Sequence, residues 1–278
     1  MEVIVAKTAG FCFGVKRAVE KVYANVDKEH VYTYGPIIHN EQVVADLEKH
    51  GVRVVEEDTD LTLLPEGTIV VRAHGASHAE FDRLRECGMQ IEDATCPFVS
   101  KIYRIVEEES KAGRTVIIVG NAAHPEVRGI RGWSGEDTYV VGSIEEANNL
   151  NILAKNISIV SQTTFNLKKF KEIVEIFEKK GYDIKCLNTI CNATEVRQTE
   201  ARQIASQVDA MIVIGGKNSS NTQKLFEICK EECSNTYYIQ TAEDLDYTAI
   251  RGMQRIGITA GASTPKNIIE EVQTRCQI

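Results

Sequence analysis

Residues 2–14 read EVIVAKTAGFCFG and place a cysteine between a short apolar run and a segment of helical periodicity. The run EVIV has the β-branched composition and the length of a strand. After Cys12, the residues Val15, Ala18 and Val22 recur at the spacing of one helix face. Cys12 therefore lies where a strand connects to a helix, and such connections carry the functional residues of parallel α/β proteins.

The same order of elements recurs in the body of the chain. A first copy contains two strands that end in polar loops and then a cysteine before a helix: VYTYGPIIHN (31–40), TIVVRAHGAS (68–77) and EDATCPFVSKIY (92–103). A second copy has the same three parts: RTVIIVGNAAHPE (114–126), NISIVSQTTFN (156–166) and NTICNATEVRQ (188–198). Strands that alternate with helices predict parallel sheets, and the recurrence predicts equivalent lobes.

A third copy is divided between the two ends of the chain. Its two strands and polar loops are DAMIVIGGKNSSN (209–221) and RIGITAGASTPKN (255–267). The missing strand, loop and cysteine are those of residues 2–14. We therefore expect an α/β fold of three similar small lobes with parallel sheets, spanning residues 14–96, 97–194, and 195–278 together with 1–13.

The composition is that of a globular protein with an excess of acidic residues. The 278 residues are 43% apolar, and 32 basic residues against 40 acidic ones give a formal net charge of −8. This charge disfavours a nucleic-acid-binding role, which depends on neutralising phosphates. No apolar run approaches the ~20 residues of a membrane span, and the start MEVIVAKTAG lacks the basic character of a signal peptide. We expect a cytoplasmic protein that binds neither nucleic acid nor membrane.

The eight cysteines fall into two groups. They are too sparse for a disulfide scaffold, and a reducing compartment would keep them as thiols. Four lie on apolar helix faces, and we expect them to pack in the core: Cys87, Cys229, Cys233 and Cys276. Cys186 alternates like a strand residue and is compatible with either role. The remaining three, Cys12, Cys96 and Cys191, occupy the repeated strand-to-helix connections.

Three thiols at equivalent positions indicate a metal centre. If the lobes face a common axis at the carboxyl ends of their strands, their cysteines meet there. A helix N-terminus favours the thiolate, which is the ligand form of cysteine. Soft sulfur ligands select zinc, copper(I) or iron–sulfur clusters, and three ligands leave one position open. Two interpretations remain at this point: a 4Fe-4S cluster with one open iron, or a zinc ion with three cysteines and a water.

Polar residues in the other repeated loops suggest an anionic ligand. They are neutral or weakly basic donors: His39, His74, His124, Ser219, Asn221 and Ser263. The stretch GGKNSSN joins a strand to a helix, and helix starts of this kind bind phosphate groups. Each histidine taken alone is equally compatible with a solvated loop residue, and Ser220 is equally well explained as part of a helix cap.

Glu126 and Thr163 are candidates for proton transfer. Glu126 follows His124 by two residues, and Thr163 lies in the loop after the corresponding next strand. A carboxyl group in a pocket that excludes water has a raised pKa and can donate a proton, which the threonine hydroxyl could relay. An acidic residue in the first turn of a helix is the simpler explanation for Glu126.

Ten short motifs, in order between residues 8 and 265, resemble those of a known family: GFCFGVKRA, IIHN, AHG, DATCP, HPEV, QTT, ICNAT, RQ, KNSSN and TAGAS. They look like the motif series of the 4-hydroxy-3-methylbut-2-enyl diphosphate reductases, which perform the last step of the methylerythritol phosphate route to isoprenoids. The resemblance covers nearly the whole chain. It implies a three-lobed, trefoil-like monomer around one 4Fe-4S cluster, with Cys12, Cys96 and Cys191 as ligands and one open iron that binds the substrate hydroxyl.

The resemblance also implies roles for the loop residues. The residues around the substrate diphosphate would be His39, His74, His124, Thr163, Ser219, Ser220, Asn221 and Ser263. Glu126 and Thr163, beside His124, would deliver protons. Ferredoxin or flavodoxin would supply two electrons singly, and the hydroxyl would leave as water, to give isopentenyl diphosphate or dimethylallyl diphosphate.

Three other classes of protein fit parts of the pattern. Quinolinate synthase is also three-lobed with one cluster cysteine per lobe, but the motifs HPEV and KNSSN favour the reductase. A non-catalytic iron–sulfur sensor would leave the histidines, serines, asparagine and glutamate of the loops without a role. A zinc-dependent hydrolase would use the same three cysteines, and metal analysis distinguishes it.

Overall fold

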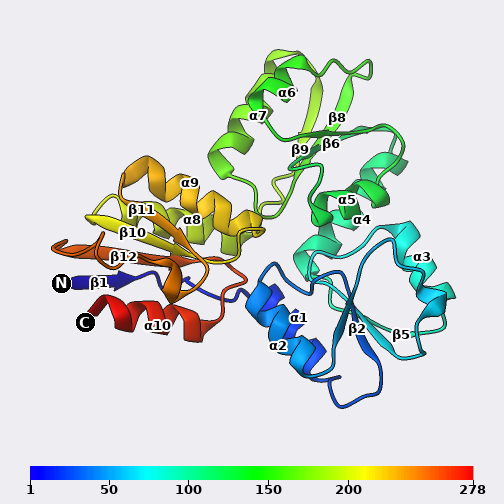
Figure 1. Ribbon diagram of the computed structural model, residues 1–278. Coiled ribbons are helices and arrows are strands. Elements are labelled where there is room, and N and C mark those ends of the chain that lie inside the picture. Colours follow the sequence, from blue (N-terminus) through cyan, green and yellow to red (C-terminus); the bar gives the residue numbers. More distant parts are fainter. Residues whose placement is uncertain (278) are drawn as a thin grey trace. The chain divides into compact units, whose positions relative to one another are not determined.

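The structure is a computed structural model that describes residues 1–277. Within these residues the strands form three four-stranded sheets, and neighbouring strands in each sheet are parallel (Figure 1). The predicted fold class, α/β with three parallel-sheet lobes, is confirmed.

The sheet formed by strands between residues 31 and 93 has the order β3-β2-β4-β5. Its strands are β2 (Val31–Tyr34), β3 (Arg53–Val55), β4 (Thr68–Val71) and β5 (Gln90–Asp93). The helices between residues 13 and 86 are α1 (Phe13–Tyr23), α2 (Glu41–Lys49), the short η1 (Leu61–Leu63) and α3 (His78–Glu86). Every residue of the central strands β2 and β4 is buried, which explains their apolar sequences.

The next sheet has the order β7-β6-β8-β9. Its strands are β6 (Thr115–Val119), β7 (Thr138–Val141), β8 (Asn156–Ser161) and β9 (Asp183–Cys186). The helices are α4 (Pro97–Lys111), α5 (Pro125–Trp133), α6 (Ile144–Asn149) and α7 (Leu167–Lys179). The apolar face of α4, with Val99, Ile102 and Val106, is buried, and Pro97 starts this helix at a position where its missing N–H is not needed.

The last sheet has the order β1-β12-β10-β11 and joins the two ends of the chain. Its strands are β1 (Glu2–Val5), β10 (Ala210–Ile214), β11 (Thr236–Ile239) and β12 (Arg255–Ala260). The helices are α8 (Asn192–Ala205), α9 (Ser220–Glu232), the short η2 (Ala242–Asp244) and α10 (Lys266–Gln277). Figure 1 shows β1, in blue, beside β12, and the two pair in parallel from Glu2↔Arg255 to Val5↔Ile258. The N-terminal strand therefore completes the third repeat, as predicted.

Each sheet is stabilised by apolar strands that are covered on both faces. All five residues of β10, with the sequence AMIVI, are buried, and Ile212 and Ile214 have no exposed surface. Burial of one such side chain contributes roughly 2–3 kcal/mol. The strand that leads to each repeated cysteine (β1, β5 or β9) lies at a sheet edge, where its chain can leave toward the next helix.

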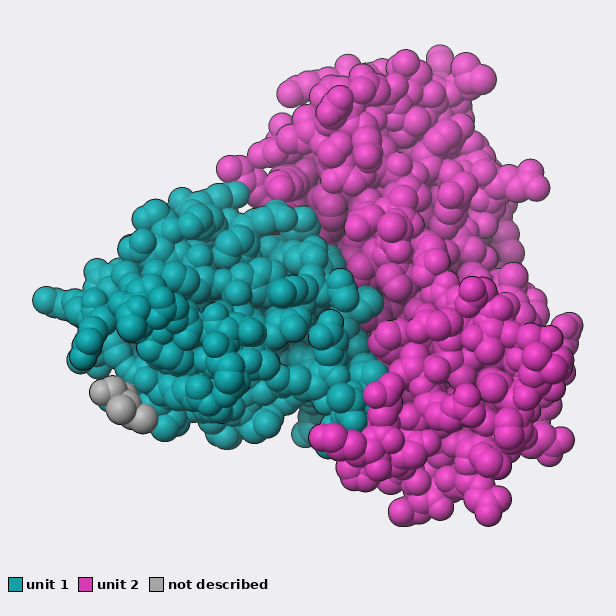
Figure 2. Space-filling model, viewed as in Figure 1, with its two compact units in different colours: residues 1–16, 38–46, 192–278 teal, residues 17–37, 47–191 magenta. Residues whose placement is uncertain are grey.

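The chain divides into two compact units, shown in Figure 2. Unit 1 comprises residues 1–16, 38–46 and the part from residue 192 onward, and it contains the sheet completed by β1. Unit 2 comprises residues 17–37 and 47–191 and contains the other two sheets. The lobe boundaries expected from the sequence stay a prediction. Among residues 1–277, no helix has the length and apolar character needed to cross a membrane.

The structure tests the prediction that four of the cysteines pack in the core. Cys229, Cys233 and Cys276 are buried, as predicted. Cys87 lies just after the end of α3 and is only partly buried, but it packs against the buried core beside β2 and β4, as predicted, and donates its S–H to the Leu84 carbonyl at 2.9 Å. Cys186 is the last residue of β9 and is exposed.

Candidate active site

The three repeated cysteines occupy equivalent positions in the backbone. Each directly precedes a helix, and each N–H donates to the carbonyl of the second residue after a neighbouring strand. The bonds are Cys12 to Ala262 (3.3 Å, after β12), Cys96 to Ala73 (3.0 Å, after β4) and Cys191 to Thr163 (3.0 Å, after β8). One backbone arrangement therefore presents a thiol three times at the carboxyl ends of parallel strands.

The environment of these thiols differs from that of the core cysteines. Cys12, Cys96 and Cys191 are each partly exposed, whereas Cys229 has no exposed surface. Burial raises the pKa of the Cys229 thiol to about 12, so this group stays protonated at neutral pH. A metal ligand must be an accessible thiolate, and the exposure of the three repeated cysteines suits that role, unlike that of the buried Cys229, Cys233 and Cys276.

In unit 2, Glu126 and Thr163 form a buried pair. Thr163 donates its N–H to Oε1 of Glu126 at 2.6 Å and its Oγ1–H to Oε2 at 2.7 Å. Glu126 is 2% exposed, and burial raises its pKa from 4.5 to about 7, although the two hydrogen bonds from Thr163 oppose this shift. The carboxyl group therefore exchanges a proton near neutral pH, which supports the predicted proton-donor chemistry.

His74 and His124 lie side by side in the same unit. Their ring centroids are 5.2 Å apart in an edge-to-face arrangement. His124 is the N-cap of α5, and its Nδ1 accepts the Glu126 N–H at 3.1 Å. Because Nδ1 is an acceptor in this bond, the neutral ring carries its proton on Nε2 and offers an N–H donor there.

In unit 1, three loops bring together the remaining polar candidates. Ser263, which follows β12, donates its Oγ–H to the His39 carbonyl at 3.1 Å. A Cβ on Gly216 would lie 2.6 Å from that same carbonyl, so only glycine permits this approach. The Gly216 carbonyl in turn accepts the Ser219 N–H at 3.0 Å. His39, Ser219 and Ser263 are thus linked through one short backbone path.

The start of α9 provides donors for an anion. Ser219 caps this helix by accepting the Thr222 N–H, and the partly exposed Ser220 is its first residue. Asn221 is 5% exposed, and within the described residues its Nδ2 is a buried donor without a hydrogen-bond partner. An unsatisfied buried donor costs about 1–3 kcal/mol, and an anion at the helix start would relieve this cost.

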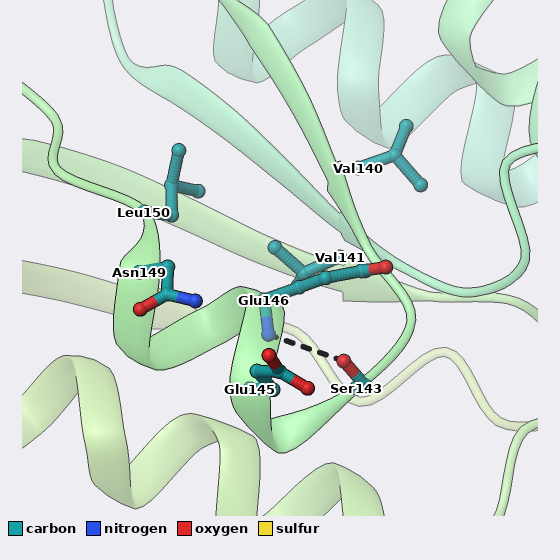
Figure 3. A pocket seen from close by; sticks show the side chains of 7 residues that line it. All are labelled: Val140, Val141, Ser143, Glu145, Glu146, Asn149 and Leu150. Carbon is teal, nitrogen blue, oxygen red and sulfur yellow. Dashed lines mark hydrogen bonds between the residues drawn. The ribbon is translucent and has the colours of Figure 1, made fainter.

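A surface pocket of about 450 Å³ lies elsewhere in unit 2, beside α6 (Figure 3). It is lined by Val141, Ser143, Glu146 and neighbouring residues, and Ser143 accepts the Glu146 N–H at 3.1 Å to cap the helix. Its lining includes none of the predicted site residues. The acidic side chains there make it unsuited to a diphosphate.

Sequence reasoning missed one side chain beside the site. Tyr103 lies on the buried face of α4, and its hydroxyl donates to the His74 carbonyl at 3.1 Å. A buried tyrosine needs a partner for its hydroxyl, so its position on an apolar helix face was the available signal. The partner itself could not be identified from the spacing.

These features define the class of protein. Its repeated parallel α/β lobes each present a cysteine at a helix start, and the neighbouring loops carry polar donors and a buried carboxyl group.

The family model described as LytB protein matches residues 3–277. A relative from Caldanaerobacter subterraneus subsp. tengcongensis, named 4-hydroxy-3-methylbut-2-enyl diphosphate reductase, is 48% identical over 98% of this chain and 95% of its own. A relative of the same name from Geobacter sulfurreducens is 47% identical over 100% and 97%. The chain belongs to the LytB family, as its motifs predicted.

Solved structures agree with this assignment. The E-1-hydroxy-2-methyl-but-2-enyl-4-diphosphate reductase from Plasmodium falciparum aligns with a TM-score of 0.93 at 28% identity, over 99% of this chain and 87% of that one. A structure of (E)-4-hydroxy-3-methyl-but-2-enyl diphosphate reductase, described as the terminal enzyme of the non-mevalonate pathway, aligns with a TM-score of 0.69 at 42% identity, over 100% and 99%.

The raised pKa of Glu126 predicts a pH-dependent stability. Below pH ~4.5 the carboxyl group is protonated in both the folded and the unfolded chain. As the pH rises from about 4.5 to about 7, the unfolded chain loses this proton first, so burial of Glu126 lowers the free energy of unfolding by ~3 kcal/mol across this window. Glu126→Gln removes this dependence.

Chemical denaturation at pH 4.5 and pH 8 measures the effect. The difference in unfolding free energy between the parent and Glu126→Gln should move in favour of the variant by ~3 kcal/mol on going to pH 8. The exposed Glu145, changed to Gln, controls for the loss of one carboxyl charge. A constant difference between parent and Glu126→Gln at the two pH values would contradict the raised pKa.

Proposed function

We propose that this chain reduces 4-hydroxy-3-methylbut-2-enyl diphosphate to isopentenyl diphosphate and dimethylallyl diphosphate. The chain is an oxidoreductase of the LytB family, and this near-full-length family match is the observation that carries the proposal. The reaction breaks the C–O bond of the hydroxyl group and takes up two electrons and two protons. One proton leaves with the hydroxyl as water, and the other is added at one of two allylic carbons, which gives the two products.

The cofactor of this proposal is one 4Fe-4S cluster with Cys12, Cys96 and Cys191 as ligands and one open iron. The chemistry of the donors fits: three partly exposed thiols lie in one repeated backbone arrangement at helix starts. When bound, the cluster supplies single-electron transfer and a Lewis-acidic iron for the substrate hydroxyl. Single electrons call for a one-electron carrier, and we propose ferredoxin or flavodoxin.

The substrate diphosphate is bound by neutral donors in this proposal. The binding residues are His39, His74, His124, Thr163, Ser219, Ser220, Asn221 and Ser263. Two observations support it: the buried Asn221 Nδ2 lies at the start of α9, and the bond to His124 Nδ1 leaves a donor on Nε2. Neutral donors and a helix dipole bind a diphosphate without strong ion pairs, which would slow the release of the diphosphate product.

Glu126 and Thr163 deliver a proton, with His124 as the neighbour that fixes the start of α5. A protonated Glu126 can donate from Oε2 to Thr163 Oγ1 across 2.7 Å, and the threonine can pass its own proton to the substrate hydroxyl. A pKa of about 7 leaves a large fraction of the carboxyl group protonated at neutral pH.

We also propose that the protein is a monomer and that it is cytoplasmic. A reducing compartment such as the cytoplasm keeps the ligand cysteines as thiols.

Anaerobic turnover tests the proposed function most directly. Protein prepared without oxygen, with a reduced one-electron donor and the hydroxylated allylic diphosphate, should form both isoprenoid diphosphates. Product identification by mass spectrometry is the measurement. If no product forms while the protein holds its full iron content, the proposed reaction is wrong.

Cysteine variants test the ligand set. Cys12→Ser, Cys96→Ser and Cys191→Ser should each lose the brown colour and most of the roughly four irons that a 4Fe-4S cluster contributes. Cys229→Ser, at a buried core thiol, is the matched control and should keep both iron and activity. Iron analysis and absorption spectra measure the outcome. Protein that is colourless and holds one zinc per chain would identify a zinc site instead.

Glu126→Gln tests the proton role. The amide keeps the size of the side chain but cannot supply a proton, so turnover should fall by at least ~100-fold while iron content and substrate binding are retained. Steady-state kinetics and iron analysis separate these effects. Turnover near that of the parent would exclude Glu126 as the proton donor.

A further inference from the structure

The loop that carries His74 is held at three consecutive carbonyl groups. Tyr103 Oη donates to the His74 carbonyl at 3.1 Å, Arg72 Nε to that of Gly75 at 3.3 Å, and Trp133 Nε1 to that of Ala76 at 3.0 Å. Carbonyl groups in a loop are usually satisfied by water or by local turns. Three side-chain donors in succession fix the backbone of this loop and therefore the position of the His74 ring.

Two of these donors form one aromatic pair from other elements. Tyr103 lies on α4 and Trp133 ends α5, and their rings stack with centroids 5.4 Å apart and planes 11° apart. Tyr103 is 5% exposed, and burial raises the pKa of its hydroxyl far above the usual value, so the group stays a hydrogen-bond donor. The pair therefore connects the His74 loop to the helices that begin after Cys96 and His124.

A glycine in α5 makes room for the tyrosine hydroxyl. A Cβ on Gly129 would lie 2.4 Å from Tyr103 Oη, which is far shorter than real Cβ contacts. Gly129 is in the interior of a nine-residue helix, where alanine is intrinsically preferred. Its conformation does not require glycine, because its φ is not positive. The glycine is therefore explained by the close approach of the Tyr103 hydroxyl to the helix backbone.

We propose that Tyr103 is a positioning residue for diphosphate binding: its hydroxyl, seated against Gly129 and bonded to the His74 carbonyl, sets the place of His74 beside His124. The proposal rests on the proposed function, in which both histidines bind the diphosphate. Tyr103 itself does not contact the substrate. It acts by holding the two imidazole rings at the observed separation of 5.2 Å, so that binding does not need to order the loop.

Tyr103→Phe removes the hydroxyl and keeps the stacked ring. The KM for the allylic diphosphate should rise about 5- to 10-fold, as expected for one lost hydrogen bond, with kcat changed less than about twofold. The Kd for inorganic diphosphate, measured by calorimetry, should rise by the same factor. Iron content should stay that of the parent, since the ligands of the proposed cluster are untouched.

Tyr32→Phe is the matched control. Tyr32 is also fully buried in unit 2, and its hydroxyl donates to the Pro65 carbonyl at 3.3 Å, away from the His74 loop. It should lower the melting temperature as Tyr103→Phe does, but leave KM and the diphosphate Kd unchanged. If the two variants change the Kd alike, or neither changes it, Tyr103 has only a structural role and the proposal is wrong.

A double-mutant cycle with Gly129 tests the geometry. Gly129→Ala in the parent should lower the melting temperature and raise the diphosphate Kd, because the added methyl group displaces the tyrosine hydroxyl. In the Tyr103→Phe background the nearest ring atom is Cζ at 3.3 Å, a contact that a small shift of the ring relieves, so Gly129→Ala should lower the melting temperature much less than in the parent. Equal destabilisation by Gly129→Ala in both backgrounds would overturn the assignment.

His74→Ala separates this proposal from the proposed function. If it binds inorganic diphosphate as tightly as the parent, the diphosphate role of His74 fails, and the positioning role fails with it. If His74→Ala weakens binding while Tyr103→Phe does not, only the positioning role is overturned. Weakening by both supports the two together.

Discussion

A single backbone hydrogen bond, repeated three times, determines where the thiols of this protein lie. In each repeat the cysteine N–H donates to the loop two residues beyond a neighbouring strand, and a helix begins at the next residue. Such a bond contributes only about 1 kcal/mol to stability. Its effect is geometric, because it ties the start of a helix to the carboxyl end of a sheet. The apolar strands stabilise each sheet, and this bond determines the position of the cysteine.

Buried carboxyl groups of the same unit can be held in opposite states, as two glutamates of unit 2 show. Glu109 is 7% exposed, and although burial alone would raise its pKa, bonds from Lys185 and Ser158 and the nearby Arg114 lower it. Glu126 is 2% exposed and accepts two hydrogen bonds from the uncharged Thr163, so burial prevails and its pKa rises. Glu109 is thus a structural anion, whereas Glu126 can exchange a proton near neutral pH.

Much of this arrangement could be predicted from the sequence, because strands and helices follow local periodicity. The runs VIIV and AMIVI are buried strands, and the recurrence of a cysteine before a helix located β1 in the sheet of the C-terminal region. The contacts made by the loops could not be predicted in this way. Residues 38–46 group with unit 1 because the His39 carbonyl meets Ser263 and Gly216, which lie more than 170 residues away in sequence. Contacts of this kind depend on tertiary approach and leave no periodic signal.

The glycine at position 129 shows how such an approach can still affect the sequence. In a helix interior, glycine costs about 0.5–1 kcal/mol relative to alanine, so its presence needs a compensating contact. Here the compensation is space for the Tyr103 hydroxyl, which holds the His74 carbonyl, while Trp133 from the same helix holds that of Ala76. Glycine makes the helix less stable, but the contacts that it permits fix the backbone of the His74 loop before a ligand binds. In the proposed function, the histidine of this loop thereby binds with the precision of a residue on a rigid element.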